Sequence, residues 1–93
     1  MNTPTCKIVR SNCDTRFMYV RYYRNEYFTR SWVKYIAINA SGDIYGFSRK
    51  PIHGHITGLW YLYDGRMADK VNYLGRATGK YIPSKSLRRV VKC

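Results

Sequence analysis

His53 and His55, separated by Gly54, form the one constellation in this chain whose residue types and spacing suit acid–base or metal chemistry. In an extended segment, side chains two residues apart point to the same side, so both imidazoles would face one site. Imidazole changes its charge near neutral pH and is a common metal ligand. The pair would suit a metal, a phosphate or a nuclease, but paired loop histidines are more commonly solvated. We predict that the protein is not an enzyme, with a nuclease using His53 and His55 as the alternative.

The other chemistry-bearing residues do not add an enzymatic signature. The chain contains no glycine-rich phosphate loop and no nucleophile elbow. Its acids stand at least five residues apart, with no adjacent pair of the kind that marks general acid–base work: Asp14, Glu26, Asp43, Asp64 and Asp69. No catalytic residue is assigned.

The three cysteines match no common disulfide framework or zinc pattern. They are Cys6, Cys13 and Cys93. A bridge between Cys6 and Cys13 or a metal bound by them is the alternative, but a zinc ion needs about four ligands and only the two histidines could complete the set. We expect free thiols, no bound metal and no cofactor.

Arginine and tyrosine alternate densely between residues 16 and 30. Arginine can bind phosphate with two parallel hydrogen bonds, and tyrosine can stack on an exposed base. The residues predicted to contact nucleic acid here are Arg16, Tyr19, Arg21, Tyr22, Tyr23, Arg24 and Arg30. On a strand, alternation leaves at least one Arg/Tyr face outside. The competing interpretation places most of these tyrosines in or near the core with wet hydroxyls.

A second basic concentration follows Asp69, after which the chain has no acid. Its cations are Lys70, Arg76, Lys80, Lys85, Arg88, Arg89 and Lys92. Cations without counter-charges repel one another, so this segment would gain from an external anion. We select Lys85, Arg88 and Arg89 as phosphate contacts, and a solvated basic tail is the alternative.

The whole chain has 93 residues, with 17 Lys and Arg against five acids, which gives a formal charge of +12. A field of this size attracts polyanions and repels basic surfaces, whatever the fold. Binding to nucleic acid through such a surface should weaken strongly with salt, because neutralising phosphates releases counterions. The charge therefore predicts an acidic partner.

The elements that must position these residues read mainly as strands. Residues 32–48 predict a hairpin, because β-branched and aromatic runs flank the turn formers of residues 39–43. Further strands are expected at residues 59–63 and 70–74, and residues 16–30 favour a strand over a helix. Pro83 and Ser84 resemble a helix start, with Leu87, Val90 and Val91 on one side of the turns that follow.

We therefore expect a mainly β fold, a small antiparallel meander or barrel with one short C-terminal helix, and leave an α+β fold open. The length fits a single domain over residues 1–93 with flexible termini. Hydrophobic residues make up 45% of the chain, which argues against disorder. No stretch approaches the roughly 20 apolar residues of a membrane helix or the apolar run of a signal peptide, so we expect a cytoplasmic protein with no membrane partner.

One part of the chain is similar to a known group of proteins. The carrying residues are the hairpin and following Pro at residues 35–51, then Trp60, Tyr73-Leu74-Gly75 and Ser86-Leu87. Over about residues 32–90 this pattern resembles small accessory (early-region) proteins of tailed bacteriophages. The resemblance implies an origin and a host-cell cytoplasmic location, and it transfers no catalytic residue.

Together these observations predict a small basic, phage-encoded, non-catalytic protein that binds nucleic acid through its Arg/Tyr-rich surface. The alternative is a phage inhibitor that docks on an acidic or nucleic-acid-binding site of a host or defence protein, since charge complementarity steers both kinds of encounter. The sequence makes no prediction of oligomeric state.

Overall fold

The computed structural model describes residues 3–11, 16–62 and 70–92. Within them lie nine strands and one turn of 3-10 helix. Their bounds are β1 Thr5–Ser11, β2 Phe17–Tyr22, β3 Asn25–Arg30, β4 Tyr35–Ile38, β5 Asp43–Phe47, β6 Ile52–His53, β7 Trp60–Tyr61, β8 Val71–Arg76, η1 Pro83–Lys85 and β9 Arg88–Lys92. The expected mainly β fold is confirmed. No helix in the described residues is long and apolar enough to cross a membrane.

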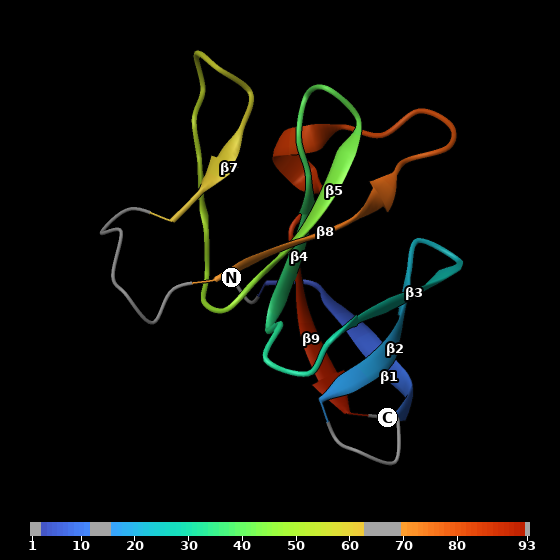
Figure 1. Ribbon diagram of the computed structural model, residues 1–93. Coiled ribbons are helices and arrows are strands. Elements are labelled where there is room, and N and C mark those ends of the chain that lie inside the picture. The colour runs from blue at the N-terminus through green and yellow to red at the C-terminus, as the bar shows by residue number, and fades with distance from the viewer. Residues whose placement is uncertain (1–2, 12–15, 63–69, 93) are drawn as a thin grey trace.

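Seven of these strands form one sheet in the order β3-β2-β1-β9-β4-β5-β8 (Figure 1). Only β1 and β9 run parallel, while every other neighbouring pair is antiparallel. The sheet curls until its two end strands approach each other, and the Asn72 amide of β8 donates a 2.9 Å hydrogen bond to the Thr29 hydroxyl of β3. The result is a nearly closed barrel of the expected small antiparallel kind.

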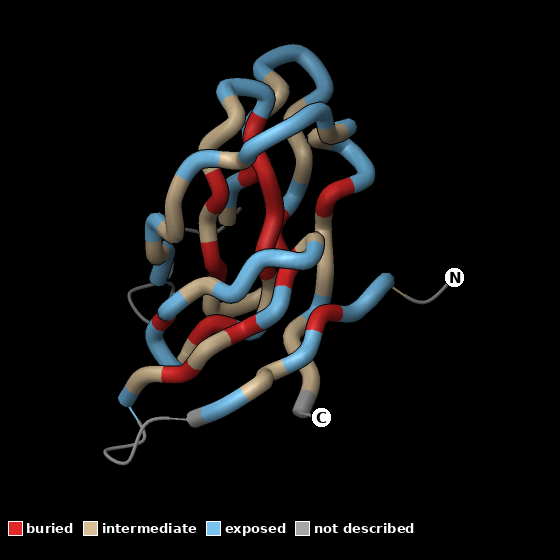
Figure 2. Tube along the Cα trace, turned by 90° about the vertical axis from the view of Figure 1, so that its right-hand side faces the viewer, coloured by how far each residue is buried: buried red, intermediate tan, exposed pale blue. Residues whose placement is uncertain are grey.

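The main core fills the inside of this curled sheet. On β2, Met18, Val20 and Tyr22 are buried while their neighbours are more exposed, as the two-residue period of a strand requires. They pack with Ile36 of β4 and Ile44 of β5, which lie on the same inner face of the curled sheet. Figure 2 shows the buried stretches running through the middle of the molecule, with exposed loops at its upper end.

The predicted hairpin at residues 32–48 is confirmed as the pair β4 and β5, although its first strand begins at Tyr35. Ile38 pairs with Ile44, and the turn is closed by the Gly42 amide, which donates to the Asn39 carbonyl at 2.8 Å. Gly42 has φ +91, a conformation that side chains disfavour. The strand expected at residues 70–74 is also present, as β8.

Residues 16–30 form a hairpin of two strands. β2 and β3 pair from Phe17 and Arg30 to Tyr22 and Asn25, which leaves Tyr23 and Arg24 as a two-residue turn. Both turn residues have positive φ, at 48 and 71, where Asn and Gly are usual. Such a conformation costs on the order of 1–2 kcal/mol per residue, so the surrounding contacts must hold it.

The expected C-terminal helix is wrong. Pro83 does start a helical turn, but it ends after three residues at Lys85, and Arg88–Lys92 becomes strand β9. This strand lies in the middle of the sheet, parallel to β1 and antiparallel to β4. Its Val90 and Val91 favour a strand once two neighbours are there to supply a ladder. The residues that pair with β9 on both neighbouring strands are more than 50 positions away in the sequence. The residues around β9 therefore do not by themselves predict this pairing.

An arm built from β6 and β7 covers part of the outside of the sheet. Ile52 pairs with Tyr61 and His53 with Trp60. Trp60 packs on Ala37 and Phe47, which point outward from β4 and β5. Of the strand expected at residues 59–63, only Trp60–Tyr61 forms, and residue 63 lies outside the described residues.

Candidate nucleic-acid interface

The outer face of β1, β2 and β3 carries aromatic and basic side chains in register. Because strand pairing places partners side by side, Arg10, Tyr19 and Phe28 form one row across the three strands. Phe17 and Arg30 form the row beside it. The next row on the other side contains Lys7, Arg21 and Glu26. We call these eight residues the open face.

The aromatic rings of the open face touch one another and are flanked by guanidinium groups. The ring centre of Phe28 lies 4.8 Å from that of Phe17, nearly parallel to it, and 5.1 Å from that of Tyr19. The Arg10 guanidinium lies 4.0 Å from the Tyr19 ring centre, and the Arg30 guanidinium lies 4.8 Å from that of Phe17. Phe28 itself is 48% exposed. The arrangement offers an open ring between two cations.

Electrostatics on this face favour an anion. Among its described residues Lys7, Arg10, Arg21 and Arg30 stand against one carboxylate, Glu26. Glu26 lies 3.6 Å from Arg10 and 3.2 Å from Arg21, so it partly neutralises both cations. These pairs are exposed, and exposed ion pairs are typically worth less than about 1 kcal/mol.

Arg89 extends the positive surface from the second basic concentration. It pairs with Thr5 of β1 and Tyr35 of β4, and its strand neighbours Arg88 and Val90 lie at inward-facing positions. Its register therefore puts Arg89 on the same outer face as Lys7. Neighbouring strands are about 4.8 Å apart, so Arg89 lies roughly 10 Å from β2 in the sheet.

The structure gathers some of the predicted contact residues and separates others. Tyr19, Arg21, Arg30 and Arg89 lie on the outer face of the sheet, and Arg16 is exposed just before β2. Arg24 is exposed in the turn at the far end of β2, and Lys85 is exposed in the 3-10 turn.

Tyr22 is a correction, because it cannot stack on a base in this structure. Its side chain is 0% exposed, and its hydroxyl donates a 2.7 Å hydrogen bond to the carbonyl of Ser86. Burial raises the pKa of Tyr22 well above its usual range. Ser86 in turn accepts a 2.9 Å hydrogen bond from the Ile38 amide at its hydroxyl. Tyr22 thus joins β2 to β4 and the C-terminal segment.

Arg88 and Tyr23 are bound to each other. One Arg88 nitrogen donates to the Tyr23 hydroxyl at 2.7 Å, and the other donates to the carbonyls of Lys85 and Leu87 at 2.8 and 2.9 Å. Tyr23 also packs edge-on against Tyr22 and Tyr81. These contacts hold the strained turn in place, and the phosphate contact of Arg88 and the base contact of Tyr23 stay predictions.

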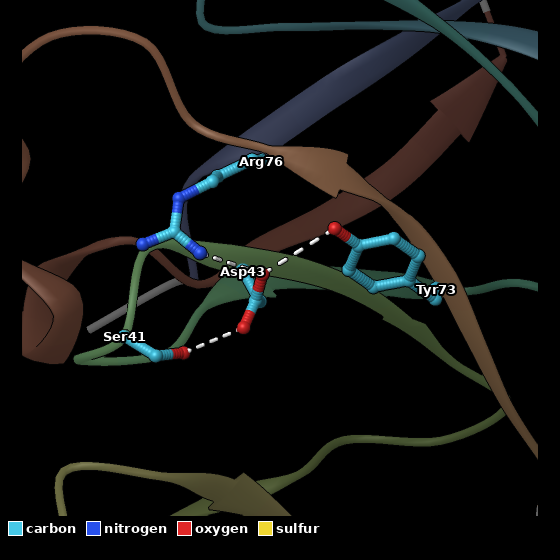
Figure 3. A network of polar contacts seen from close by, with 4 residues as sticks. All are labelled: Ser41, Asp43, Tyr73 and Arg76. Carbon is cyan, nitrogen blue, oxygen red and sulfur yellow. Dashed lines mark hydrogen bonds and ion pairs between the residues drawn. The ribbon is translucent and has the colours of Figure 1, made fainter.

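Three of the C-terminal cations, Arg76, Lys85 and Arg89, lie in different parts of the fold. Arg76 approaches the Asp43 carboxylate at 3.4 Å, and the same carboxylate accepts hydrogen bonds from Tyr73 and Ser41 (Figure 3). Desolvation and the Asp43 charge raise the pKa of Tyr73. Lys85 lies in the 3-10 turn and Arg89 on the outer face. The fold therefore separates these three cations from one another.

The two histidines come together, but not in the expected way. Their ring centres are 5.8 Å apart, and His53 packs 4.8 Å from Trp60. Both ring nitrogens of His53 are buried without a hydrogen-bond partner among the described residues. No group of three or more His, Cys, Asp or Glu in the described part of the chain could hold a metal ion.

Cys6 is a buried free thiol on β1. Burial raises its pKa to about 12, against a smaller opposing effect of the Arg88 charge. A thiol that stays protonated is a poor nucleophile and a poor metal ligand. The other two cysteines, Cys13 and Cys93, lie outside the described residues.

Sequence reasoning missed five of the eight residues of the open face, namely Lys7, Arg10, Phe17, Glu26 and Phe28. The turn between β2 and β3 was not predicted, because Tyr23 and Arg24 are unusual residues at positive φ. The region therefore resembles one continuous strand. With the turn placed there, the pairing of Tyr19 with Phe28 and of Phe17 with Arg30 follows directly. The addition of Arg10 required the contact between β1 and β2, which spans a register shift between Ile8 and Arg10.

Comparison with known proteins adds no assignment, since no family model, no curated protein and no solved structure matches this chain.

Proposed function

We propose that this protein is a non-catalytic nucleic-acid-binding protein and that the open face is its binding surface. The observation that carries the proposal is the exposed Phe28 ring, which lies in a row of aromatic rings between the guanidinium groups of Arg10 and Arg30. Aromatic rings that bases can stack on, combined with cations that track phosphates, are the two components of sequence-tolerant nucleic-acid binding.

The charge of the whole chain supports the same proposal. A net charge of +12 raises the local concentration of a polyanion and speeds its association. Lys7, Arg21 and Arg89 continue the positive surface beyond the aromatic row. The expected phage origin stays a prediction.

Fluorescence anisotropy with labelled oligonucleotides at several salt concentrations tests the proposal. The double variant Arg10→Gln with Arg30→Gln should weaken binding, and the slope of log affinity against log salt should fall by roughly 0.7 to 0.9 for each lost phosphate contact. The matched control is Arg76→Gln with Lys80→Gln, which removes the same charge from exposed positions elsewhere. Equal losses in the two double variants would place binding outside the open face.

One observation favours the second candidate, an inhibitor that docks on an acidic or nucleic-acid-binding site of a host or defence protein. Large apolar side chains are exposed along the arm and the neighbouring edge strand β8: Ile52, Ile56, Leu59, Tyr61, Val71 and Tyr73. Ile56 is 100% exposed. Exposed apolar groups that gather on one side commonly mark a protein contact.

Affinity capture from nuclease-treated host lysate separates the two functions. An inhibitor should recover one stoichiometric protein whose capture is lost in Ile56→Lys and retained in Phe28→Ala. Loss of every partner after nuclease treatment would contradict the inhibitor and agree with direct nucleic-acid binding.

A further inference from the structure

We infer that the ligand of the open face is single-stranded nucleic acid, with one unpaired base stacked on Phe28 and phosphates at Arg10 and Arg30. The inference rests on the proposed function and narrows it to a substrate class. It concerns DNA and RNA alike, because a base ring and a phosphate are common to both.

The position of Phe28 provides the first argument. Its ring is the most open of the three aromatic rings on the open face, and it lies on the surface of a sheet, not at the tip of a projecting element. In a duplex the base faces are stacked on one another and only the base edges reach the grooves. A ring at the level of a sheet surface can therefore meet a base face only if that base is unpaired and unstacked.

The absence of a groove-reading element in the described residues gives a second argument. Duplex readers commonly insert an α-helix or a two-stranded ribbon into the major groove. The longest helical element in residues 3–11, 16–62 and 70–92 is the three-residue turn η1. The β6–β7 arm is a two-stranded ribbon, but each of its strands is only two residues long and Trp60 fixes it against the sheet.

The placement of the cations provides the third argument. Arg10 and Arg30 lie over Tyr19 and Phe17, which are the two rings that flank Phe28. Phe28 contacts both of these rings, so each guanidinium lies one ring away from it. The spacing suits a strand whose phosphates pass on both sides of a splayed base.

The test uses an oligonucleotide of about 12 nucleotides, within the range of single-domain site sizes. It is supplied as single-stranded DNA, as single-stranded RNA and as a DNA duplex formed with the complementary strand. We expect both single strands to bind more tightly than the duplex at equal salt. Phe28→Ala should weaken single-strand binding roughly 5- to 150-fold, the range for loss of one stacked base, and leave duplex affinity and the salt slope unchanged.

Two further variants distinguish the loss of base stacking from the loss of apolar side-chain volume and from misfolding. Phe28→Leu keeps an apolar side chain but has no ring face, so it should behave like Phe28→Ala. Phe28→Trp should retain binding, and its added fluorescence should be quenched by the single strand and not by the duplex.

The outcomes distinguish this inference from the proposed function. Duplex binding as tight as single-strand binding, or equal losses on both ligands in Phe28→Ala, would overturn the single-strand assignment while nucleic-acid binding stands. Failure of the wild-type protein to bind any of the three ligands at low salt would overturn both.

Discussion

Two aromatic surfaces lie on the outside of the same sheet and differ in what covers them. Over β4 and β5, Trp60 of the arm packs on Phe47 and Ala37, which are fully buried, and Trp60 itself is only 9% exposed. Over β2 and β3, Phe28 remains half-exposed, and guanidinium groups lie on its two neighbours. We call the first surface the covered face.

The comparison shows how the chemistry of the cover decides the use of the surface. Trp60 is held by two hydrogen bonds, from its indole nitrogen to the Pro83 carbonyl at 3.1 Å and from its amide to the Asn39 side chain at 2.8 Å. An exposed guanidinium on a ring contributes only about 0.5–1 kcal/mol and can move to a phosphate. The covered face therefore serves stability, and the open face stays available to a ligand.

Removing the Trp60 ring, which covers the covered face, should have the largest effect of the changes proposed here. Trp60→Ala should lower the free energy of unfolding by about 3–5 kcal/mol, because it exposes Phe47 and leaves a large void. Urea denaturation measures the loss. The neighbouring exposed residue is the control, and Tyr61→Ala should cost less than about 1 kcal/mol. Similar losses in the two variants would mean that the arm does not stabilise the covered face.

Tyr22 and Tyr19 lie on the inner and outer faces of β2, so removal of their hydroxyl groups should change the stability of the protein by different amounts. Tyr22→Phe should lower the free energy of unfolding by about 1–3 kcal/mol, because the buried Ser86 carbonyl loses its donor. Tyr19→Phe, on the open face, should change stability by less than about 0.5 kcal/mol. Chemical denaturation compares them. Weaker nucleic-acid binding by a folded Tyr22→Phe protein would contradict the assignment of Tyr22 to the core.

Raising the pH should weaken the inner side of the same sheet through Cys6. The pKa of this thiol is raised in the folded protein from 9.0 to about 12, so between these values only the unfolded chain ionises. Stability that is present below pH 9 is therefore lost as pH rises toward 12. At about pH 10 the wild-type protein should lose about 1 kcal/mol more than Cys6→Val does, relative to neutral pH. Equal losses in denaturation titrations would show that Cys6 does not set this dependence.

Removing the one described carboxylate of the open face should have the smallest effect and the opposite sign. Glu26→Gln frees Arg10 and Arg21 and removes a charge that repels phosphate. Affinity for oligonucleotides should rise by roughly 2- to 5-fold at low salt, with stability changed by less than about 1 kcal/mol. Anisotropy titration measures the gain. Asp43→Gln is the control and should not produce it, since Asp43 pairs with Arg76 on other strands.

Short-range patterns predicted a substantial part of the fold. The hairpin of β4 and β5 and the strand β8 were both predicted, because turn formers such as Gly42 separate alternating β-forming runs. Strand β9 was not, since the three-residue spacing of Leu87 and Val90 fits one side of a helix and does not fit the two-residue period of a strand. Central strands take their identity from two neighbours, and β9 lies between β1 and β4.

The sequence predicted the kinds of side chain in the candidate site better than it predicted which residues belong to the site. The Arg/Tyr composition of residues 16–30 indicated phosphates and bases, and Tyr19, Arg21 and Arg30 do lie on the open face. Tyr22 and Arg88 carry the same side-chain chemistry but bind the protein itself. A sequence read without its partners cannot separate these roles, because the hydroxyl and guanidinium suit an internal acceptor as well as a ligand.

Charge, composition and local turn signals need no knowledge of contacts, so the amino-acid sequence alone predicts a basic, mainly β protein with arginine and tyrosine concentrated between residues 16 and 30. Only the tertiary structure decided which of two aromatic surfaces is covered, which arginines are already bound, and that Phe28 lies exposed between Arg10 and Arg30. The physical reason is that exposure and register depend on pairings between distant strands, and each of these pairings becomes favourable only when the whole sheet has formed.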